Sequence, residues 1–216
     1  MNDLEYLIID LDNTIYPESA GVFKRVDHLI NQYLEEKMGF PKEEVNPLRI
    51  KYYREYGTTL RGLMINYRIE PEDYLQYVHD IDMKELLSKD ERLDRVLKNI
   101  PVEKVIFTNA SKAHAENVLN TLEISDNFTH IFDIVAMDYL AKPNPVTYRK
   151  LLSTLGVKGE RCLYIDDIEI NLQPAKELGM RTAIVSNNGH EKKSYIDFVI
   201  KEISEIGNFF ENQVSE

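Results

Sequence analysis

From about residue 91 onwards, short apolar runs alternate regularly with segments of helical periodicity. The apolar runs span residues 104–107, 131–135, 162–165, 182–185 and 198–200, and helices are expected at 92–99, 112–122, 146–155 and 171–178. Strands and helices that alternate at this spacing form a mostly parallel sheet covered by helices on both faces. An earlier apolar run at 5–11 adds a buried strand to the same core. The chain is therefore expected to adopt an α/β fold.

Residues 16–90, between the first strand and this alternating region, have a different character. Their apolar residues recur at helical spacing, and turn-forming residues such as Gly57 and Pro71 interrupt the pattern. No convincing strand is found there, so about four helices are expected. The predicted organisation is a sheet core formed by residues 1–15 and 91–216, with an all-helical segment of residues 16–90 inserted like a lid at the carboxyl edge of the sheet.

Composition narrows the classes of protein that fit this fold. The chain has 216 residues, of which 43% are hydrophobic, so it can bury a substantial core. Its formal net charge of −11 argues against binding to polymeric nucleic acid or to an anionic membrane. No apolar run is long enough to cross a membrane, the N-terminus lacks a signal-like pattern, and the single cysteine, Cys162, excludes a disulfide framework. A cytoplasmic protein is therefore expected.

The strand at 5–11 runs directly into two carboxylates, Asp10 and Asp12, that are separated by one residue. Side chains two residues apart on a strand share a face, and ligands of open α/β sheets bind beyond the carboxyl ends of the strands. Two such charges about 5 Å apart repel each other by roughly 3 kcal/mol at an effective dielectric constant of about 20. A fold keeps such a pair when a cation lies between them or one of them carries a proton. The pair therefore indicates a metal site or a nucleophile beside an acid/base, with a plain polar exit from the strand as the alternative.

Polar residues also mark two later places where strands are expected to end. Thr108 and Asn109 lie between the strand at 104–107 and a helix, where a hydroxyl and free main-chain amides form a natural phosphate site. Ordinary capping of the helix is the alternative. Lys142 precedes another helix in a loop that two prolines stiffen, so its ammonium group can be aimed inward, although a lone lysine is more often a solvated surface charge.

A second pair of carboxylates, Asp166 and Asp167, follows the strand at 162–165, and Asn171 begins the next helix. Hard divalent cations such as Mg²⁺ take oxygen ligands and usually keep several waters. One aspartate can therefore ligate a metal directly while its neighbour holds a metal-bound water, and Asn171 can orient both. An Asp-rich turn is the alternative, and it is weakened because the first strand also ends in paired aspartates.

Taken in order, these four clusters resemble the four sequence motifs of the haloacid-dehalogenase (HAD) superfamily, and in particular those of its phosphatases. The matching residues are Asp10-Leu-Asp12-Asn-Thr14, Thr108-Asn109, Lys142-Pro143 and Asp166-Asp167 with Asn171, and the chain departs from the pattern at Ile168-Glu169, where relatives often carry a small hydroxyl residue. The resemblance covers the whole chain, because the helical segment at 16–90 occupies the place of the superfamily's helical cap. It implies a Rossmann-like core. The acid at position 12 favours phosphoryl chemistry, since a leaving halide needs no proton.

The resemblance implies Mg²⁺-dependent hydrolysis of a phosphate monoester through an aspartyl-phosphate intermediate. Asp10 is expected to attack phosphorus, while Asp12 protonates the leaving group and then activates the attacking water. Thr108, the amide of Asn109 and the ammonium group of Lys142 are expected to bind and neutralise the phosphoryl oxygens.

The resemblance also implies how magnesium is held. Asp10, the main-chain carbonyl of Asp12 and the carboxylate of Asp167 are expected to be its ligands. Asp166 is expected to act through water, and Asn171 is expected to orient the loop.

The sequence of the helical segment narrows the resemblance further. The runs Tyr52-Tyr53-Arg54-Glu55-Tyr56-Gly57 and Leu60-Arg61-Gly62-Leu63 are similar to the cap of yeast-type pyrimidine 5′-nucleotidases. This similarity implies that the substrate is a pyrimidine nucleoside monophosphate, UMP or CMP. Tyr52 and Tyr56 share a helix face and are expected to contact the substrate together with Arg61. Packing within the cap is the alternative for the tyrosines, and a salt bridge is the alternative for Arg61.

The sequence leaves several alternative functions open. A sugar-phosphate phosphatase or a phosphomutase of the same superfamily would use the same core. A receiver-like phospho-switch or a catalytically silent binding protein would carry similar residues without turnover, but a receiver normally has contiguous acids and lacks a large helical insert. The five histidines form no transition-metal spacing and are expected to be structural or surface residues: His28, His79, His114, His130 and His190.

Overall fold

The computed structural model describes residues 3–187, 191 and 193–211, and its strands form a single parallel sheet. The strands are β1 (Tyr6–Ile9), β2 (Glu103–Phe107), β3 (His130–Phe132), β4 (Cys162–Asp166), β5 (Arg181–Val185) and β6 (Phe198–Ile200). Their order is β3-β2-β1-β4-β5-β6, and each neighbouring pair is parallel. This is the strand order of the Rossmann-like doubly wound fold, so the predicted α/β class is confirmed.

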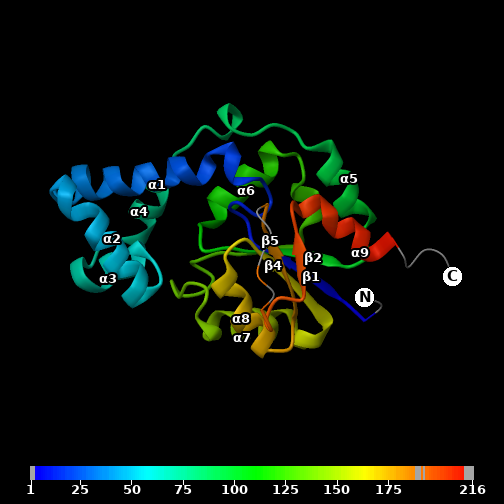
Figure 1. Ribbon diagram of the computed structural model, residues 1–216. Helices are drawn as coiled ribbons and strands as arrows, with labels where there is room; N and C mark the ends of the chain where they lie inside the picture. Colours follow the sequence, from blue (N-terminus) through cyan, green and yellow to red (C-terminus); the bar gives the residue numbers. More distant parts are fainter. Residues whose placement is uncertain (1–2, 188–190, 192, 212–216) are drawn as a thin grey trace.

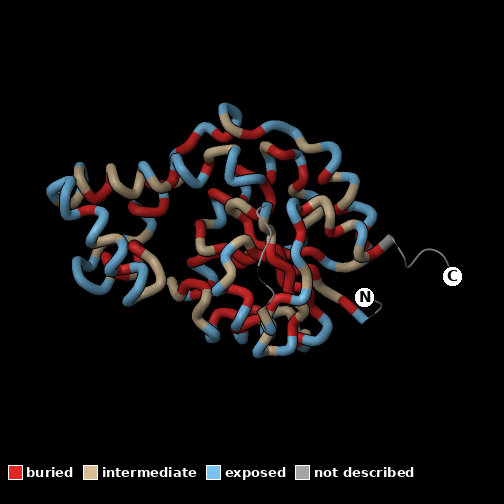
Figure 2. Tube along the Cα trace, in the orientation of Figure 1, coloured by how far each residue is buried: buried red, intermediate tan, exposed pale blue. Residues whose placement is uncertain are grey.

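Helices cover both faces of the sheet, because successive side chains of each strand point to opposite faces. In β1, for example, Leu7 and Ile9 belong to one hydrophobic cluster and Ile8 belongs to the other. The first cluster is covered by α5 (Glu91–Asn99), α6 (Lys112–Thr121) and α9 (Asn208–Glu211), and the second by α7 (Pro145–Leu155) and α8 (Glu169–Glu177). Figure 1 shows these two layers, and Figure 2 shows the buried strands between them.

The register of the sheet places the ends of its three central strands at one level. Ile9 of β1 pairs with Ile106 of β2 on one side and with Ile165 of β4 on the other. The chain leaves β1 towards β2 and returns to the opposite side of β1 for β4, so the strand order reverses at this point. Crevices for ligands form at such a reversal in open α/β sheets. The residues that follow Ile9, Ile106 and Ile165 therefore meet at one edge.

Helices α1 (Val22–Gln32), α2 (Lys42–Tyr56), α3 (Thr59–Tyr67) and α4 (Pro71–Val78), which we call the helical segment, project beside the sheet (Figure 1). They enclose a third hydrophobic cluster, which Ile134 and Ala141 join from the other part of the chain. Gly62 of α3 allows close packing there, since a Cβ atom on this glycine would lie 2.2 Å from the ring of Tyr52. The start of α1 packs instead with the sheet core through Val22 and Val26.

Short helices complete the described part of the chain, and one strand is shorter than the sequence suggests. The short helices are η1 (Glu18–Ala20), η2 (Tyr33–Lys37), η3 (Met83–Glu85), η4 (Ser125–Asn127), η5 (Gly159–Arg161) and η6 (Ile203–Gly207). The strand predicted at 131–135 ends at Phe132, because the Asp133 carboxylate accepts hydrogen bonds from the amides of Lys112 and Ala136 and turns the chain. Among the described residues, no helix is both long and apolar enough to span a membrane.

Candidate active site

Lys142 lies at the centre of the polar groups that meet at the carboxyl edge of the sheet. Its Nζ atom donates to Asp10 Oδ1 at 2.6 Å, to Asp166 Oδ2 at 2.9 Å and to the main-chain oxygen of Phe107 at 2.8 Å. The side chain is 1% exposed. Burial alone lowers the pKa of Lys142, but the charges of Asp10 and Asp166 outweigh this effect and raise it to about 12. The ammonium group is therefore permanently charged, and its three protons are directed at these three oxygens.

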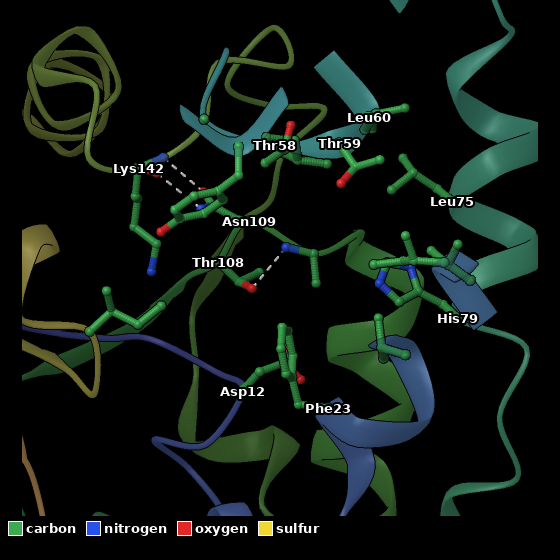
Figure 3. A pocket seen from close by; sticks show the side chains of 18 of the residues that line it. Asp12, Phe23, Thr58, Thr59, Leu60, Leu75, His79, Thr108, Asn109 and Lys142 are labelled. Carbon is green, nitrogen blue, oxygen red and sulfur yellow. Dashed lines mark hydrogen bonds between the residues drawn. The ribbon is translucent and has the colours of Figure 1, made fainter. Parts of the chain in front are cut away.

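Asn109 and Asn144 fix the loop that carries Lys142. The side chain of Asn109 accepts from the main-chain N–H of Lys142 at 2.8 Å and donates to its carbonyl oxygen at 3.2 Å (Figure 3). Asn144 caps α7 by accepting from the amide of Val146. The Asn109 side chain is thus used to position Lys142, and only its main-chain amide can serve the phosphate role expected from the sequence.

Thr108 follows β2 and faces the pocket (Figure 3). Its Oγ1 atom accepts from the main-chain N–H of Ala110 at 3.0 Å, and the residue is 2% exposed. Because a hydroxyl that accepts one hydrogen bond still has its own proton to donate, Thr108 can offer that proton to an anionic oxygen in the pocket. Ser111 caps α6 by accepting from the amide of His114, so the helix begins beside this hydroxyl.

Asp166 is fully enclosed and held from several sides. Besides Lys142, its carboxylate accepts from the Tyr164 hydroxyl, from the main-chain N–H of Ile168 at 2.8 Å and from Asn171 Nδ2 at 3.0 and 3.1 Å. Its exposed fraction is 0%. This network ties the loop after β4 to α8, because Asn171 donates to both oxygens of the Asp166 carboxylate.

Asp10 and Asp167 form the more open side of the same acidic group. Thr14 Oγ1 lies 3.1 Å from Asp10 Oδ2 and 3.4 Å from Asp167 Oδ1, so it lies between the two carboxylates. Burial raises the pKa of Asp10 well above its ordinary value, Lys142 opposes this rise, and Asp166 and Asp167 add to it. Burial and the charge of Asp166 likewise raise the pKa of Asp167 to about 7.

These acidic residues have the composition and spacing of a site for a hard cation. One carboxylate oxygen from each of Asp10, Asp166 and Asp167 lies within 4.8 Å of the other two. When ionised, the three carboxylates carry three negative charges, and the ammonium group of Lys142 compensates one of them. Two negative charges are left without compensation, and the repulsion between them adds to burial, the larger cause, in raising the pKa values of Asp10 and Asp167. A divalent ion with oxygen ligands would balance these two charges, so the residues fit Mg²⁺.

Asp12 makes side-chain contacts that the sequence did not predict. Its Oδ1 atom accepts from the Tyr16 hydroxyl and from His114 Nε2, the latter at 2.8 Å. The His114 side chain is 0% exposed, and its ring lies 4.4 Å from that of His79. Burial raises the pKa of Asp12, but His114 and Tyr16 overcome this effect and hold it below its ordinary value. His114, which was expected to be a structural or surface residue, therefore lies in the site and contacts Asp12.

A pocket of about 250 Å³ lies between the carboxyl edge and the helical segment. Its polar end is lined by Asp10, Asp12, Thr108, Asn109, Lys142 and Asp167, and its helical wall includes Phe23, Tyr53, Leu60, Tyr74, Leu75 and Val78. Figure 3 shows Lys142 and Asn109 at one side of this pocket and Leu75 and His79 at the other. The pocket therefore joins an anion-handling end to an apolar and aromatic wall.

The residues predicted to contact a substrate from the helical segment do not line this pocket. Tyr52 is 3% exposed, and its ring packs against Gly62 and, edge to face, against Tyr56. Arg61, one residue before Gly62, is also absent from the lining. The reason is the rotation of α2 about its axis, which turns Tyr52 into the hydrophobic cluster and its neighbour Tyr53 towards the pocket.

His79 and His114 were missed as members of the site. A usable signal was the position of His114 in the first turn of the helix that follows Thr108, since that turn faces the carboxyl edge. Nothing local in the sequence marks His79, which follows α4 and reaches the pocket through the tertiary fold. His28 and His130 are exposed, and His190 lies outside the described residues.

Comparisons with known proteins identify relatives of similar sequence. The chain is 29% identical over 188 residues to phosphate metabolism protein 8 of Saccharomyces cerevisiae, covering 79% of this chain and 58% of that protein. It is 29% identical over 114 residues to the glyceraldehyde 3-phosphate phosphatase of Pyrococcus furiosus, covering 50% of this chain and 47% of that protein. The chain thus spans less than two thirds of the length of these relatives.

The fold is shared with solved structures along almost its whole length. A HAD phosphatase from Thermococcus onnurineus superposes with a TM-score of 0.66 at 16% sequence identity, covering 96% of this chain and 98% of that one. The carboxylates and the lysine of this chain are assembled at the carboxyl edge of the sheet. Residues 4–179 match the haloacid dehalogenase-like hydrolase family, so the chain belongs to that family.

Proposed function

We propose that this protein hydrolyses phosphate monoesters through an aspartyl-phosphate formed on Asp10. The observation that carries the proposal is the buried contact of the Lys142 ammonium group with both Asp10 and Asp166 at the floor of a pocket. Such a contact opposes the rise in the pKa of Asp10 that burial causes, and it orients the Asp10 carboxylate, which must be ionised and held in place to act as a nucleophile. Phosphatases among the relatives agree with this assignment of the chemistry.

In the first step, a carboxylate oxygen of Asp10 attacks phosphorus and the ester oxygen leaves with a proton from Asp12, which must take up this proton when the substrate binds because its pKa in the free protein is below the ordinary value. In the second step, Asp12 takes a proton from water, and the resulting nucleophile attacks the phosphorus of the aspartyl-phosphate. Inorganic phosphate is released, the Asp10 carboxylate is regenerated and Asp12 carries a proton again. Asp12 lines the pocket beside Thr108, which supports this double duty.

The remaining polar residues bind and orient the phosphoryl group. The Thr108 hydroxyl proton and the main-chain amide of Asn109 are the donors for its oxygens. Lys142 acts first on the protein itself, because its contacts reduce repulsion among the carboxylates and hold Asp10 in place for attack. Its positive charge also favours an anionic group directly above Asp10.

Magnesium is the proposed cofactor of this reaction. Asp10, Asp167 and the main-chain carbonyl of Asp12 would hold it, with Asp166 acting through water and through its contacts to Asn171 and Lys142. When bound, the ion would supply positive charge that stabilises the transferring phosphoryl group. The uncompensated charge of the three carboxylates supports this assignment.

For the substrate we propose a pyrimidine nucleoside monophosphate, UMP or CMP, with the helical segment acting as the cap over it. The support is the aromatic wall, because Phe23, Tyr53 and Tyr74 offer faces on which a base can stack. A small sugar phosphate is the alternative, in line with the named substrate of the P. furiosus relative. Phosphomutase activity is a further alternative with the same core. A cytoplasmic location stays a prediction.

The test is release of inorganic phosphate by the full chain in the presence of Mg²⁺. A panel of UMP, CMP, AMP and glucose 6-phosphate separates the substrate classes, and we expect at least about a tenfold preference in kcat/KM for UMP and CMP, worth about 1.4 kcal/mol. Equal rates across the panel would discard the nucleotidase assignment and leave the phosphatase one. Stoichiometric labelling without turnover would indicate a receiver-like switch, and neither labelling nor release would indicate a silent binding protein.

A further inference from the structure

The contacts of Asp12 are distributed unequally over its two oxygens. Oδ1 accepts from both Tyr16 and His114, whereas Oδ2 has no hydrogen-bond partner within the described part of the chain. The side chain is 16% exposed and lines the pocket, as Figure 3 shows. One oxygen is therefore anchored inside the protein, and the other is left for a group in the pocket.

Hydrogen bonds hold the two neighbouring histidines and show which nitrogen of His114 carries a proton. Ser111 Oγ accepts from the main-chain N–H of His114 and also forms a hydrogen bond of 3.0 Å with His79 Nδ1. His79 is neutral, because burial and the neighbouring His114 lower its pKa to about 3. Because the Asp12 carboxylate accepts from His114 Nε2, His114 carries its proton on that nitrogen.

This arrangement leaves the other nitrogen of His114 unsatisfied. His114 Nδ1 is buried and has no hydrogen-bond partner among the residues that the structure describes. An unpaired polar atom in the interior costs stability, and an apolar side chain on the same helix face would avoid that cost. Packing alone therefore does not explain a histidine at this position, whereas the contact of Nε2 with Asp12 does.

We propose that His114 is a positioning residue for Asp12, which fixes Oδ1 together with Tyr16 and so presents Oδ2 to the leaving-group oxygen of the substrate. This inference rests on the proposed function, since it concerns the residue that exchanges protons in that reaction. His79 braces the His114 ring from the end of α4, at a ring separation of 4.4 Å and an interplanar angle of 32°. No proton passes through His114 in this role, because its Nε2 proton stays in the hydrogen bond to Oδ1.

A positioning role predicts a defect that depends on the leaving group. An alkoxide needs a proton as it departs, whereas 4-nitrophenolate is stable enough to leave without one. We therefore compare kcat/KM for 2-phenylethyl phosphate and for 4-nitrophenyl phosphate, which have similar size and aromatic character. The quantity kcat/KM reports all steps up to and including the first irreversible one. When phosphoryl transfer to Asp10 is irreversible, kcat/KM therefore includes protonation of the leaving group and excludes the later hydrolysis of the aspartyl-phosphate.

His114→Leu is the test variant, and His114→Gln is its conservative partner because the glutamine Nε2 atom can still donate to Asp12. We expect His114→Leu to lower kcat/KM about 100-fold for the alkyl ester and less than about fivefold for the aryl ester. His114→Gln should recover most of the loss for the alkyl ester. Both esters are assayed with the same preparation of each variant. A reduced folded fraction therefore lowers both kcat/KM values equally and leaves the alkyl-to-aryl ratio unchanged.

Val118→Ala is the matched control, since Val118 is buried on the same helix one turn beyond His114. It should leave the alkyl-to-aryl ratio unchanged even where it lowers stability. Equal losses for both esters in His114→Leu, or the same change of ratio in Val118→Ala, would overturn the positioning role. Absence of phosphate release from both esters by the unmodified protein would overturn the proposed function itself, and the inference with it.

Discussion

The carboxyl edge of the sheet and the helical segment form opposite walls of one pocket, and they are built in different ways. At the edge, ionic side chains are buried and multiply held, as the contacts of Lys142 and Asp166 show. In the helical segment, aromatic rings pack with one another around Tyr52, and neighbouring rings such as Tyr53 are exposed. The edge therefore tolerates little change, whereas the helical wall can be altered residue by residue. This difference suits a fixed chemistry combined with an adjustable substrate preference.

The largest effect is expected at the edge, from Asp10→Asn. An amide cannot act as the nucleophile, so phosphate release should fall on the order of 10⁴-fold or more, as when other catalytic nucleophiles are removed. Stability should not fall, because the substitution removes one of three mutually repelling carboxylates. Phosphate release and thermal unfolding measure the two outcomes. The exposed Asp126→Asn serves as control, and an Asp10→Asn protein that keeps a tenth of the activity would exclude the nucleophile role.

Lys142→Met tests how strongly the edge depends on its single buried cation. Removing the ammonium group leaves Asp10 and Asp166 buried without a partner charge, which typically costs about 3–5 kcal/mol. Urea unfolding without metal measures this loss, and added Mg²⁺ should restore part of it by binding the folded state. Lys150→Met removes an exposed ion pair with Asp138 and should cost less than about 1 kcal/mol. Equal losses of unfolding free energy in Lys142→Met and Lys150→Met would show that the buried edge does not depend on its charges more than the surface does.

Two adjacent tyrosines of α2 separate packing from substrate contact in the helical wall. Tyr52→Ala empties part of the hydrophobic cluster and should lower the free energy of unfolding by about 3 kcal/mol, with little change in KM for the folded protein. Tyr53→Ala removes an exposed ring from the pocket and should raise KM about three- to tenfold, which corresponds to about 1 kcal/mol. Unfolding curves measure the free energy of unfolding of both variants, and steady-state kinetics measure their KM values. A rise in KM for Tyr52→Ala alone would restore the assignment made from the sequence.

A further effect concerns acid stability at the junction of the two walls. The folded protein holds His79 neutral, with a pKa of about 3, whereas the unfolded chain binds a proton near the ordinary pKa of 6.5. Unfolding therefore takes up a proton between these values, so this stabilisation is complete above pH 6.5 and is lost as the pH falls towards 3. The loss is at most about 1.4 kcal/mol per pH unit. His79→Phe should flatten the fall in melting temperature between pH 6.5 and 5, and the surface variant His130→Phe should not.

Much of the edge could be predicted from the sequence because it depends on local patterns. Asp10, Thr108 and Asp166 each follow a short apolar strand, and parallel strands in register bring such positions to one edge. Lys142 was harder to place, since its loop belongs to no strand of the sheet. Its inward direction follows from the hydrogen bonds to Asn109, a residue 33 positions away. The length of β3 was overestimated because the hydrogen bonds of Asp133 are not visible in a hydrophobicity pattern.

The amino-acid sequence by itself determined the class of fold, the helical character of the segment after β1 and the set of acidic and basic groups at the strand ends. Alternation along a strand and periodicity along a helix are properties of neighbouring residues, so they can be read without knowing the fold. Only the tertiary structure decided that Tyr53 and not Tyr52 faces the pocket, and that His114 reaches Asp12 across 102 positions of sequence. The rotation of a helix about its axis and the meeting of distant side chains are set by packing of the whole molecule, and no local pattern contains them.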